Sequence, residues 1–353
     1  MHPPPPRPRN PRKIEDDDEN EDEDEPLAAI FHTAPVPRLD KPSAKWHFPS
    51  VLAVKLEQLR ALVRSYGSCL VAYSGGVDSV FLARVAHDEL GERALAAIAD
   101  SASLPRRELE EALELGERFH FPVRVVHTAE FENPAYLANP VNRCYFCKHE
   151  LFEELAPLAK AEGFAVIAYG ENASDVGDFR PGAKAAAEFQ VRAPLKEVGL
   201  TKAEIRELSA QLGLPTADKP QMACLSSRIP HGEVVTPEKL TMIEAAENVL
   251  KDFGFYDVRV RHHELNRRPL TPTLSPSDGE AEKTGGADQH LARIEVGTAE
   301  LPRLAEKEMA GRVFVALKEI GYDHVTVDLQ GYRRGGADEA VLSRSTHHAP
   351  HLA

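Results

Sequence analysis

Cysteine and tryptophan are scarce in this chain, whose 353 residues include four cysteines and one tryptophan. No run of about eighteen apolar residues occurs, which argues against a membrane-spanning helix. The first residues, MHPPPPRPRN, lack the apolar core of a secretory signal. We therefore expect a cytoplasmic protein without a membrane partner. In that reducing compartment, its few cysteines are expected to be ligands or nucleophiles rather than disulfides.

The chain lacks an excess of positive charge: 56 acidic residues outnumber 42 Lys and Arg, which gives a formal net charge of −14. No stretch rich in Lys and Arg with interleaved aromatic residues appears, so a nucleic-acid surface is not expected. Much of the negative charge lies in one run from Glu15 to Glu25, interrupted only by Asn20. Such a run repels itself and cannot pack, which predicts a disordered tail over residues 1–45. An acidic tail that docks a basic partner is the alternative.

Short apolar segments alternate with helical patterns between residues 46 and 215. Strands are expected at 68–73, 94–100, 123–128 and 165–170, and helices at 77–90, 105–120 and 147–163. This alternation is typical of a doubly wound α/β domain, in which helices cover both faces of a parallel sheet. Ligands of such domains bind at the carboxyl ends of the strands.

Residues 216–335 are expected to form a smaller α+β domain for substrate binding or oligomerisation. Its predicted helices are 236–255 and 305–321, and its predicted strands are 256–263, 291–296 and 324–333. Residues 266–290 are rich in Pro, Ser, Thr and Gly and have no apolar period, which predicts a disordered insertion. Residues 336–353 are expected to be a flexible tail.

The most specific motif is SGGVDS, which comes directly after the first expected strand and opens the next helix. Two glycines allow the backbone to approach an anion, and the free N–H groups at a helix start favour phosphate. A carboxylate at Asp78 would repel phosphate unless it held a magnesium ion. The predicted ATP-binding residues of this loop are Ser74, Gly75, Gly76, Val77, Asp78 and Ser79. The alternative is an ordinary strand-to-helix turn capped by serine.

SGGVDS after a first strand resembles the PP-loop ATP pyrophosphatase superfamily, which includes NAD synthetase, GMP synthetase and tRNA-thiolating enzymes. The resemblance implies that ATP adenylates a substrate oxygen and that pyrophosphate leaves. A nitrogen or sulfur nucleophile then displaces AMP, and the loop does not identify that nucleophile.

Four further segments narrow the resemblance. They are NRCYFCKHELF (142–152), GENASDVGDFRPG (170–182), ADKPQMACLSSRIPHG (217–232) and the pair VRVRHH…LARIEV. Together they resemble LarE, the ATP-dependent sulfur transferase of nickel-pincer nucleotide (lactate racemase cofactor) synthesis, over nearly all of residues 50–335. The resemblance implies that a carboxylate of a pyridinium-dicarboxylate mononucleotide is adenylated and becomes a thiocarboxylate. It also implies a homo-oligomer.

Two sulfur sources occur in that family: one sacrificial cysteine, or three cysteines that hold an iron–sulfur cluster. Cys144, Cys147 and Cys224 match the second pattern, and three thiolates can hold three irons of a four-iron (4Fe–4S) cluster. The fourth iron would be open to hydrosulfide from an unknown sulfide donor. Three alternatives stay open: a zinc site completed by His149, a redox C-x-x-C with Cys224 as sacrificial donor, and inert buried thiols. Cys69 lies within the first strand and is expected to be core.

Polar residues just beyond the expected strands extend the predicted ATP and magnesium site. Asp175 and Asp178 are expected to hold magnesium, and Arg180 to steady the leaving pyrophosphate. A helix cap with a salt bridge is the alternative. Asp100 and Ser101 end the second strand, where the resemblance implies the nucleotide base and ribose.

A phosphate of the substrate is expected at Ser227, Arg228, Arg259 and Arg261. The last two alternate on one strand and share a face, and paired guanidiniums favour an anion between them. The alternative is a solvated strand face. Glu247 and Glu295 are expected to close this pocket or to pair with the arginines. The adjacent histidines 262 and 263 are left outside the catalytic set.

Three rival functions remain. A tRNA thiolase would share the loop and the three cysteines but would need a basic groove for RNA. An amide-forming ligase of the NAD or GMP synthetase type would not need the cysteines. A nucleotide-binding sensor would do no chemistry.

Overall fold

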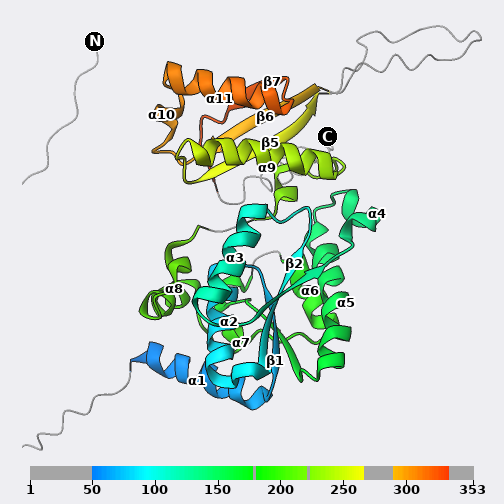
Figure 1. Ribbon diagram of the computed structural model, residues 1–353, viewed down its shortest axis with the longest axis vertical. Helices are drawn as coiled ribbons and strands as arrows, with labels where there is room; N and C mark the ends of the chain where they lie inside the picture. Colours follow the sequence, from blue (N-terminus) through cyan, green and yellow to red (C-terminus); the bar gives the residue numbers. More distant parts are fainter. Residues whose placement is uncertain (1–49, 178–179, 221–222, 266–288, 334–353) are drawn as a thin grey trace, which may run out of the picture. The chain divides into compact units, whose positions relative to one another are not determined.

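The computed structural model describes residues 50–177, 180–220, 223–265 and 289–333 (Figure 1). Four expectations fall wholly or largely outside these ranges: the tail 1–45, the magnesium ligand Asp178, the insertion and the tail 336–353. Within the described residues, no helix combines the length and the apolar character needed to cross a bilayer.

A parallel sheet of four strands forms the N-terminal part of the described chain, in the order β3-β2-β1-β4. The strands are β1 (Cys69–Tyr73), β2 (Ala94–Asp100), β3 (Val123–His127) and β4 (Val166–Tyr169). All three neighbouring pairs run parallel. The predicted α/β class is therefore confirmed. Both ends of each predicted strand of this sheet lie within one residue of the observed ends.

Helices cover both faces of this sheet (Figure 1). One face carries α1 (Val51–Tyr66), α2 (Val77–Leu90), α3 (Arg106–Arg118) and α8 (Lys202–Gln211), and the other carries α5 (Arg143–Glu162) and α6 (Pro181–Glu188). Alternation along β1 divides the core, because Cys69 and Val71 pack with the first group and Leu70 with the second. Both faces are therefore apolar, as a sheet buried on both sides requires.

Short elements connect these layers. They are η1 (Gly91–Arg93), η2 (Glu130–Glu132), α4 (Pro134–Leu137), η3 (Ala173–Asp175), α7 (Pro194–Glu197), η4 (Pro215–Asp218) and η5 (Leu225–Arg228). A separate apolar cluster joins α4 and η5 to the helix α9 (Pro237–Asp252). Its buried members include Tyr136, Leu225, Ile229 and Ile243.

A mixed sheet of three strands forms the C-terminal part. Its elements are α9 (Pro237–Asp252), β5 (Val258–Leu265), β6 (Gln289–Val296), α10 (Leu301–Leu304), α11 (Lys307–Ile320) and β7 (His324–Val327). β5 and β6 pair antiparallel from Val258↔Val296 to Leu265↔Gln289, and β6 and β7 pair parallel.

Two predicted boundaries in this part were wrong. Gln289 and His290, expected in the insertion, belong to β6. They pair with Leu265 and Glu264 at the end of the antiparallel ladder. The last strand ends at Val327 rather than at residue 333, because Asp328 and Gly331 form a turn there.

Two helical glycines should respond to alanine with opposite signs. A Cβ on Gly116 of α3 would collide with the Val123 side chain and lie 3.1 Å from the Phe121 carbonyl oxygen, whereas one on Gly311 of α11 meets nothing within 4 Å. We expect Gly116→Ala to lower the free energy of unfolding by about 1–3 kcal/mol through overpacking. Gly311→Ala should raise it by about 0.5–1 kcal/mol through helix propensity. Urea unfolding measures both, and stabilisation by Gly116→Ala would contradict the packing of α3 on β3.

Candidate active site

The SGGVDS loop connects β1 to α2 in a conformation that requires glycine. Gly75 has a φ of 70°, and the nearest heavy atom to a Cβ placed there would be the Ala112 Cβ at 2.8 Å. Ser79 Oγ accepts the Ser74 N–H at 3.1 Å and donates to the Gly76 carbonyl at 3.1 Å. The loop is thus closed on itself at the start of a long helix, with the N–H groups of the first turn available to an anion.

Asp78 lies in the first turn of α2 and is largely buried. Its Oδ2 accepts a hydrogen bond from Lys202 Nζ at 2.7 Å, while its Oδ1 has no hydrogen-bond partner among the described residues. Burial raises the pKa of Asp78, and the Lys202 ammonium opposes that rise. A buried carboxylate oxygen without a partner beside a phosphate-type loop fits the predicted magnesium ligand.

Two lysines from distant segments reach the loop, which itself contains none. Lys202 begins α8, and Lys219 lies 3.4 Å from the Gly75 carbonyl oxygen and pairs with Glu108 at 2.8 Å. Sequence analysis missed both, because each is over a hundred residues away from the loop. The capping box at Thr201, a Thr followed three residues later by Glu204, was a signal that could have located the start of α8.

The predicted magnesium and pyrophosphate residues beyond β4 pair with each other. Asn172 and Asp175 form a capping box, and Arg180 makes an ion pair with Asp175. These contacts agree with the alternative of a cap and a salt bridge, and the ligand role stays a prediction. Glu171, also buried, accepts hydrogen bonds from Tyr169 and from Lys196, the latter at 2.9 Å.

The segment after β2 is hydrogen-bonded to the loop that carries Cys224. Asp100 pairs with Arg106, and Ser101 Oγ accepts the Ser103 N–H at 3.1 Å. Ser103 then binds the later loop, because its carbonyl accepts the Leu225 N–H at 2.8 Å. The predicted nucleotide residues and the third cysteine of the motif therefore come from adjoining segments.

Arg143 joins the C-x-x-C helix to the Cys224 loop. It is 4% exposed, donates to Asn139 Oδ1 and to the Ser226 carbonyl at 2.9 Å, and has its Nη2 3.8 Å from Cys224 Sγ. Charges on Cys144, Cys147 and Cys224 would each act on this guanidinium. The structure thus brings the three predicted cysteines around one buried cation. Sequence analysis overlooked Arg143, although it directly precedes Cys144.

Hydroxyl groups support this arrangement beside the Cys224 loop. Ser226 Oγ lies 2.8 Å from Tyr136 OH and 2.8 Å from Ser103 Oγ, and Ser103 and Tyr136 also contact each other. All three side chains are buried. A closed ring of buried hydroxyls satisfies each of its three members and fixes the loop position.

The thiols differ in their surroundings. Burial raises the pKa of Cys69 to about 12, and its place in the core of β1 confirms the expectation for it. Burial also raises the pKa of Cys147, whereas the Arg143 guanidinium lowers it. Cys144 is exposed at the start of α5, and none of the four cysteines, all of them within the described ranges, is in a disulfide.

The metal group that the three cysteines would hold stays a prediction. A tetrahedral zinc ion would hold thiolates about 3.8 Å apart, from Zn–S bonds of about 2.3 Å. Among the described residues, the cysteines do not form a group whose ligand atoms all lie within 4.8 Å of one another. Binding of zinc would therefore require the thiols to move closer together.

The predicted substrate-phosphate residues lie together, and two of them pair with carboxylates. Arg228 makes two hydrogen bonds to Glu247 at 2.8 and 3.0 Å, and also binds the Cys224 carbonyl at 3.0 Å. Arg261 makes two to Glu295 at 3.0 Å each and one to the Ser227 carbonyl at 2.8 Å. Pairing with carboxylates was among the expectations.

Arg259 makes contacts of a different kind from those of the two paired arginines. It donates to the Val258 carbonyl at 2.7 Å and lies 4.8 Å from the centroid of the Tyr332 ring. Burial and the neighbouring Arg228 lower the pKa of Arg259. Because like charges gather here, an anion bound between the guanidiniums would relieve their repulsion.

A further cation links the two halves of the site. Lys148 of α5 lies 4.4 Å from the centroid of the Tyr169 ring, and its pKa is lowered by burial, while Cys147 and Glu171 oppose that shift. Sequence analysis had assigned it no role. The charges of Cys147 and Glu171, on either side of the predicted site, both act on it.

The parallel sheet, the glycine loop and the cation-lined strand ends define an ATP-using enzyme of the PP-loop class. Comparison with known proteins agrees, although no family model matches the chain. An uncharacterized protein of Synechocystis sp. is 40% identical over 285 residues, covering 81% of this chain and 97% of the relative. A pyridinium-3,5-bisthiocarboxylic acid mononucleotide synthase of Lactiplantibacillus plantarum is 28% identical over 293 residues, covering 83% and 96%.

A third relative, a glutamine-hydrolyzing GMP synthase component of Methanopyrus kandleri, is 27% identical over 214 residues, covering 56% of this chain and 67% of that protein. The chain belongs to the LarE family of ATP-dependent sulfur transferases.

Removing the cation beside Asp78 should weaken the fold in a pH-dependent way. We expect Lys202→Met to lower the free energy of unfolding by about 1–2 kcal/mol at pH 8, because a buried carboxylate loses its partner. Since the pKa of Asp78 is raised on folding, protonation favours the folded state, and the deficit should shrink as the pH falls through that pKa.

Urea unfolding at several pH values measures this effect. The control is Lys184→Met, which breaks an exposed ion pair with Glu188 and should change stability by less than about 0.5 kcal/mol. A deficit that stays constant down to about pH 4, near the ordinary pKa of a carboxyl group, would contradict the coupling of Lys202 to Asp78.

Neutralising Arg143 should make the Cys147 thiol a weaker acid. We expect Arg143→Gln to move the alkylation profile of Cys147 to higher pH, because the guanidinium lowers the pKa of that thiol. Arg143→Lys should restore part of the shift. Alkylation rates by peptide mass spectrometry measure the profile, with Arg107→Gln, at an exposed pair with Asp252, as control. Identical profiles in the Gln variant and the wild type would refute the role.

Proposed function

We propose that this protein converts a carboxylate of a pyridinium-dicarboxylate mononucleotide into a thiocarboxylate, in two half-reactions. The carboxylate first attacks the α-phosphorus of ATP and pyrophosphate leaves. A sulfur nucleophile then attacks the acyl-adenylate and AMP leaves. The relative from Lactiplantibacillus plantarum bears the name of a bisthiocarboxylic acid mononucleotide synthase, which supports this substrate class. The product would serve nickel-pincer nucleotide synthesis.

The observation that carries the proposal is the gathering of the three cysteines around Arg143. Arg143 reaches Cys224 Sγ from the same helix turn that carries Cys144, and the Cys224 loop is hydrogen-bonded to the segment after β2. A sulfur donor at the cysteines would therefore lie beside the expected nucleotide. An amide-forming ligase has no use for this arrangement.

The residues of the first half-reaction are those of the glycine loop and its neighbours. The backbone N–H groups at the start of α2 would bind phosphate oxygens, and Asp78 would hold magnesium between them. Lys202 holds the Asp78 carboxylate at 2.7 Å and so fixes its position. Arg180 would stabilise the charge on the departing pyrophosphate.

The residues of substrate binding lie on η5 and β5. Arg259 and Ser227 would bind the substrate phosphate, while the carboxylate-paired Arg228 and Arg261 add positive charge and hold the loop in place. Tyr332 beside Arg259 limits the directions in which that guanidinium can point.

The residues of the second half-reaction are Cys144, Cys147 and Cys224. An iron–sulfur cluster bound by these thiolates would supply the hydrosulfide that displaces AMP. Arg143 favours the thiolate form of Cys147 through its charge. Lys148 is placed to stabilise negative charge that develops on the acyl oxygen.

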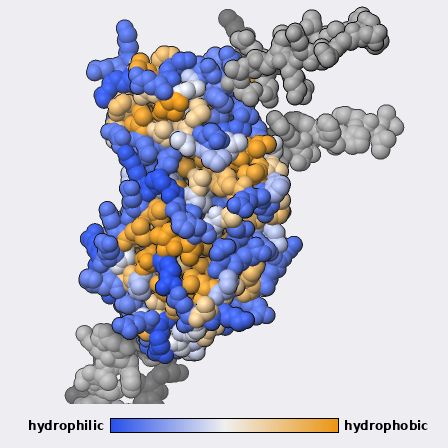
Figure 2. Space-filling view, turned by 45° about the vertical axis from the view of Figure 1, so that its right-hand side comes forward, coloured by the Kyte–Doolittle hydropathy of each residue, from blue (hydrophilic) through white to orange (hydrophobic). Residues whose placement is uncertain are grey.

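We also propose a cytoplasmic homo-oligomer that takes a small-molecule nucleotide and an external sulfide donor. Figure 2 shows hydrophobic surface in several places between hydrophilic residues. On α11, Phe314 and Val315 are 49% and 54% exposed. This face of α11 is the contact surface that we propose between subunits.

The test separates the two half-reactions. The full chain is purified anaerobically, and iron, acid-labile sulfide and the absorption spectrum are measured. ATP and the pyridinium-dicarboxylate mononucleotide are then added, and pyrophosphate and the product mass are followed. We expect substrate-dependent pyrophosphate release and a thiocarboxylate product. Ser79→Ala should lose pyrophosphate release, because the loop that holds the phosphates opens.

Cysteine variants identify the sulfur source. Cys144→Ala, Cys147→Ala and Cys224→Ala should each lose the iron signal and the thiocarboxylate but keep substrate-dependent pyrophosphate release. Cys69→Ala, in the core of β1, is the matched control and should keep both.

Other outcomes favour the rivals. Loss of the mass of hydrogen sulfide from Cys224 after one turnover would indicate a sacrificial cysteine. Amide formation with ammonia and fully active cysteine variants would indicate a ligase. Retention of transfer RNA at low salt, with thiolated RNA as product, would indicate a tRNA thiolase. No pyrophosphate release with substrate present would indicate a sensor.

A further inference from the structure

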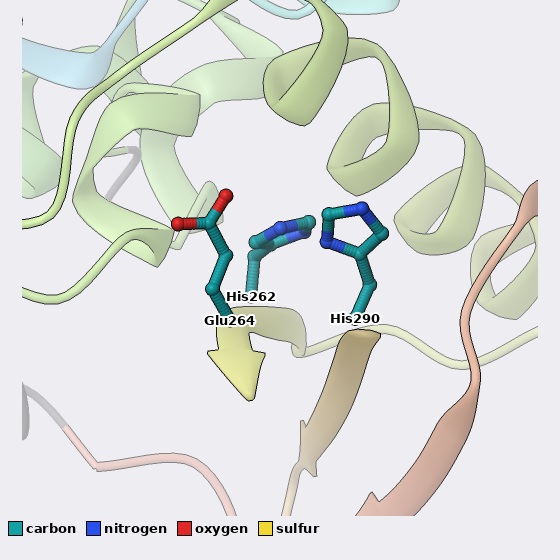
Figure 3. A group of neighbouring side chains, drawn as sticks. All are labelled: His262, Glu264 and His290. Atoms are coloured by element: carbon teal, nitrogen blue, oxygen red, sulfur yellow. The ribbon is translucent and has the colours of Figure 1, made fainter. Parts of the chain in front are cut away.

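A second group of metal-ligand side chains lies on the C-terminal sheet. β5 and β6 place Glu264 directly opposite His290, and His262 is two residues before Glu264 on the same strand. Because strand side chains alternate, the three share one face. One ligand atom of each lies within 4.8 Å of the others, and the two imidazole rings lie beside the carboxylate (Figure 3).

Two ring nitrogens in this group lack partners in the described part of the chain. His262 is 0% exposed and its buried Nε2 has no hydrogen-bond partner there, while its Nδ1 lies 3.3 Å from Tyr322 OH. The buried Nδ1 of His290 also has none. A buried nitrogen without a partner is costly, and two that face a carboxylate call for a ligand.

Tyr322 determines which nitrogen of His262 is available. When its hydroxyl oxygen accepts the Nδ1–H, the lone pair of the ring is left on Nε2. A second hydrogen bond of this kind is typical of metal-binding histidines. Tyr322 is 1% exposed, so the hydroxyl is held in place by packing.

The charges around the group favour a cation. Lys239 of α9 pairs with Glu264 Oε1 at 2.8 Å and donates to the Val234 carbonyl at 2.7 Å. Glu233 also lies here. Burial and the Glu264 carboxylate raise the pKa of Glu233, and its buried Oε2 has no hydrogen-bond partner among the described residues. Two carboxyl groups thus share one ammonium at this site.

We propose that His262, Glu264 and His290 bind a divalent first-row transition-metal ion, with Zn²⁺ as the preferred occupant. Two imidazole nitrogens and one carboxylate oxygen form a donor set that suits Zn²⁺, and water would complete the tetrahedron. Small side-chain rotations bring ligand atoms that lie within 4.8 Å to the separation that a single ion requires. The site is separate from the cysteines and does not depend on the proposed reaction.

The position of the site indicates its role. Glu264 and His290 are one pair before the end of the ladder, which closes at Leu265↔Gln289. A metal ion there would join β5 to β6 at the point where the chain leaves the sheet and returns. It would therefore stabilise the strand that carries Arg259 and Arg261.

Metal titration of the full chain tests the proposal. The protein is tag-free, stripped with a chelator, and carries Cys144→Ser, Cys147→Ser and Cys224→Ser so that thiols do not bind the metal. Co²⁺ is added and its visible absorption is followed, and Zn²⁺ is then used to displace it. We expect one tightly bound ion per chain and a spectrum of tetrahedral nitrogen and oxygen ligands.

Single substitutions in the same background locate the ion. His290→Ala and Glu264→Gln should each weaken binding at least roughly tenfold. His263→Ala, the neighbour on the opposite face of β5, should bind as the parent does. Zn²⁺ should raise the melting temperature of the parent and of His263→Ala, but not of His290→Ala. Any metal binding by histidines elsewhere in the chain is the same in every variant, so it does not affect this comparison.

Two outcomes would overturn the proposal. One is a parent chain that binds no Co²⁺ or Zn²⁺ stoichiometrically at micromolar concentrations. The other is a His290→Ala chain that is folded by circular dichroism and binds the metal as tightly as the parent.

Discussion

The arrangement of this molecule depends on one buried guanidinium. Arg143 lies at the start of α5 and holds the Cys224 loop through the Ser226 carbonyl and the Cys224 sulfur, 83 and 81 positions later in the chain. Transfer of a guanidinium from water to the protein interior costs free energy, and hydrogen bonds to carbonyl and amide oxygens offset that cost. The same charge favours the thiolate form of Cys147. Structural support and reactivity are therefore supplied by one side chain.

Two buried ion pairs extend this support into the C-terminal part. Arg228 binds Glu247 of α9, and Arg261 of β5 binds Glu295 and the Ser227 carbonyl. Buried pairs contribute little net stability when they are compared with apolar packing, but loss of one partner is costly. These pairs therefore fix the position of the Cys224 loop more than they raise the free energy of unfolding. The loop that carries the third cysteine is thus held by Arg143 of α5 on one side and by α9 and β5 on the other.

Local patterns in the sequence predicted the parallel sheet and the phosphate loop, whereas the contacts between distant segments were missed. Alternating apolar runs located every strand of that sheet, and the glycine loop located the expected phosphate site, because both signals are local. Lys202, Lys219 and Arg143 were not predicted as partners, since nothing in the sequence shows which segments meet. The insertion boundary was wrong because Gln289 and His290 are polar, although they complete a ladder. The roles of the candidate site residues stay predictions.

The ladder between β5 and β6 also affects how this family can change its length. Its last pair places residues 265 and 289 side by side, so the chain leaves and re-enters the sheet at one spot. The entropy of closing such a loop grows only with the logarithm of its length. Segments of many sizes can therefore be accommodated between these strands without a shift in register. This junction is accordingly a place where evolution, or an engineer, can add a module while the arginines of β5 keep their orientation.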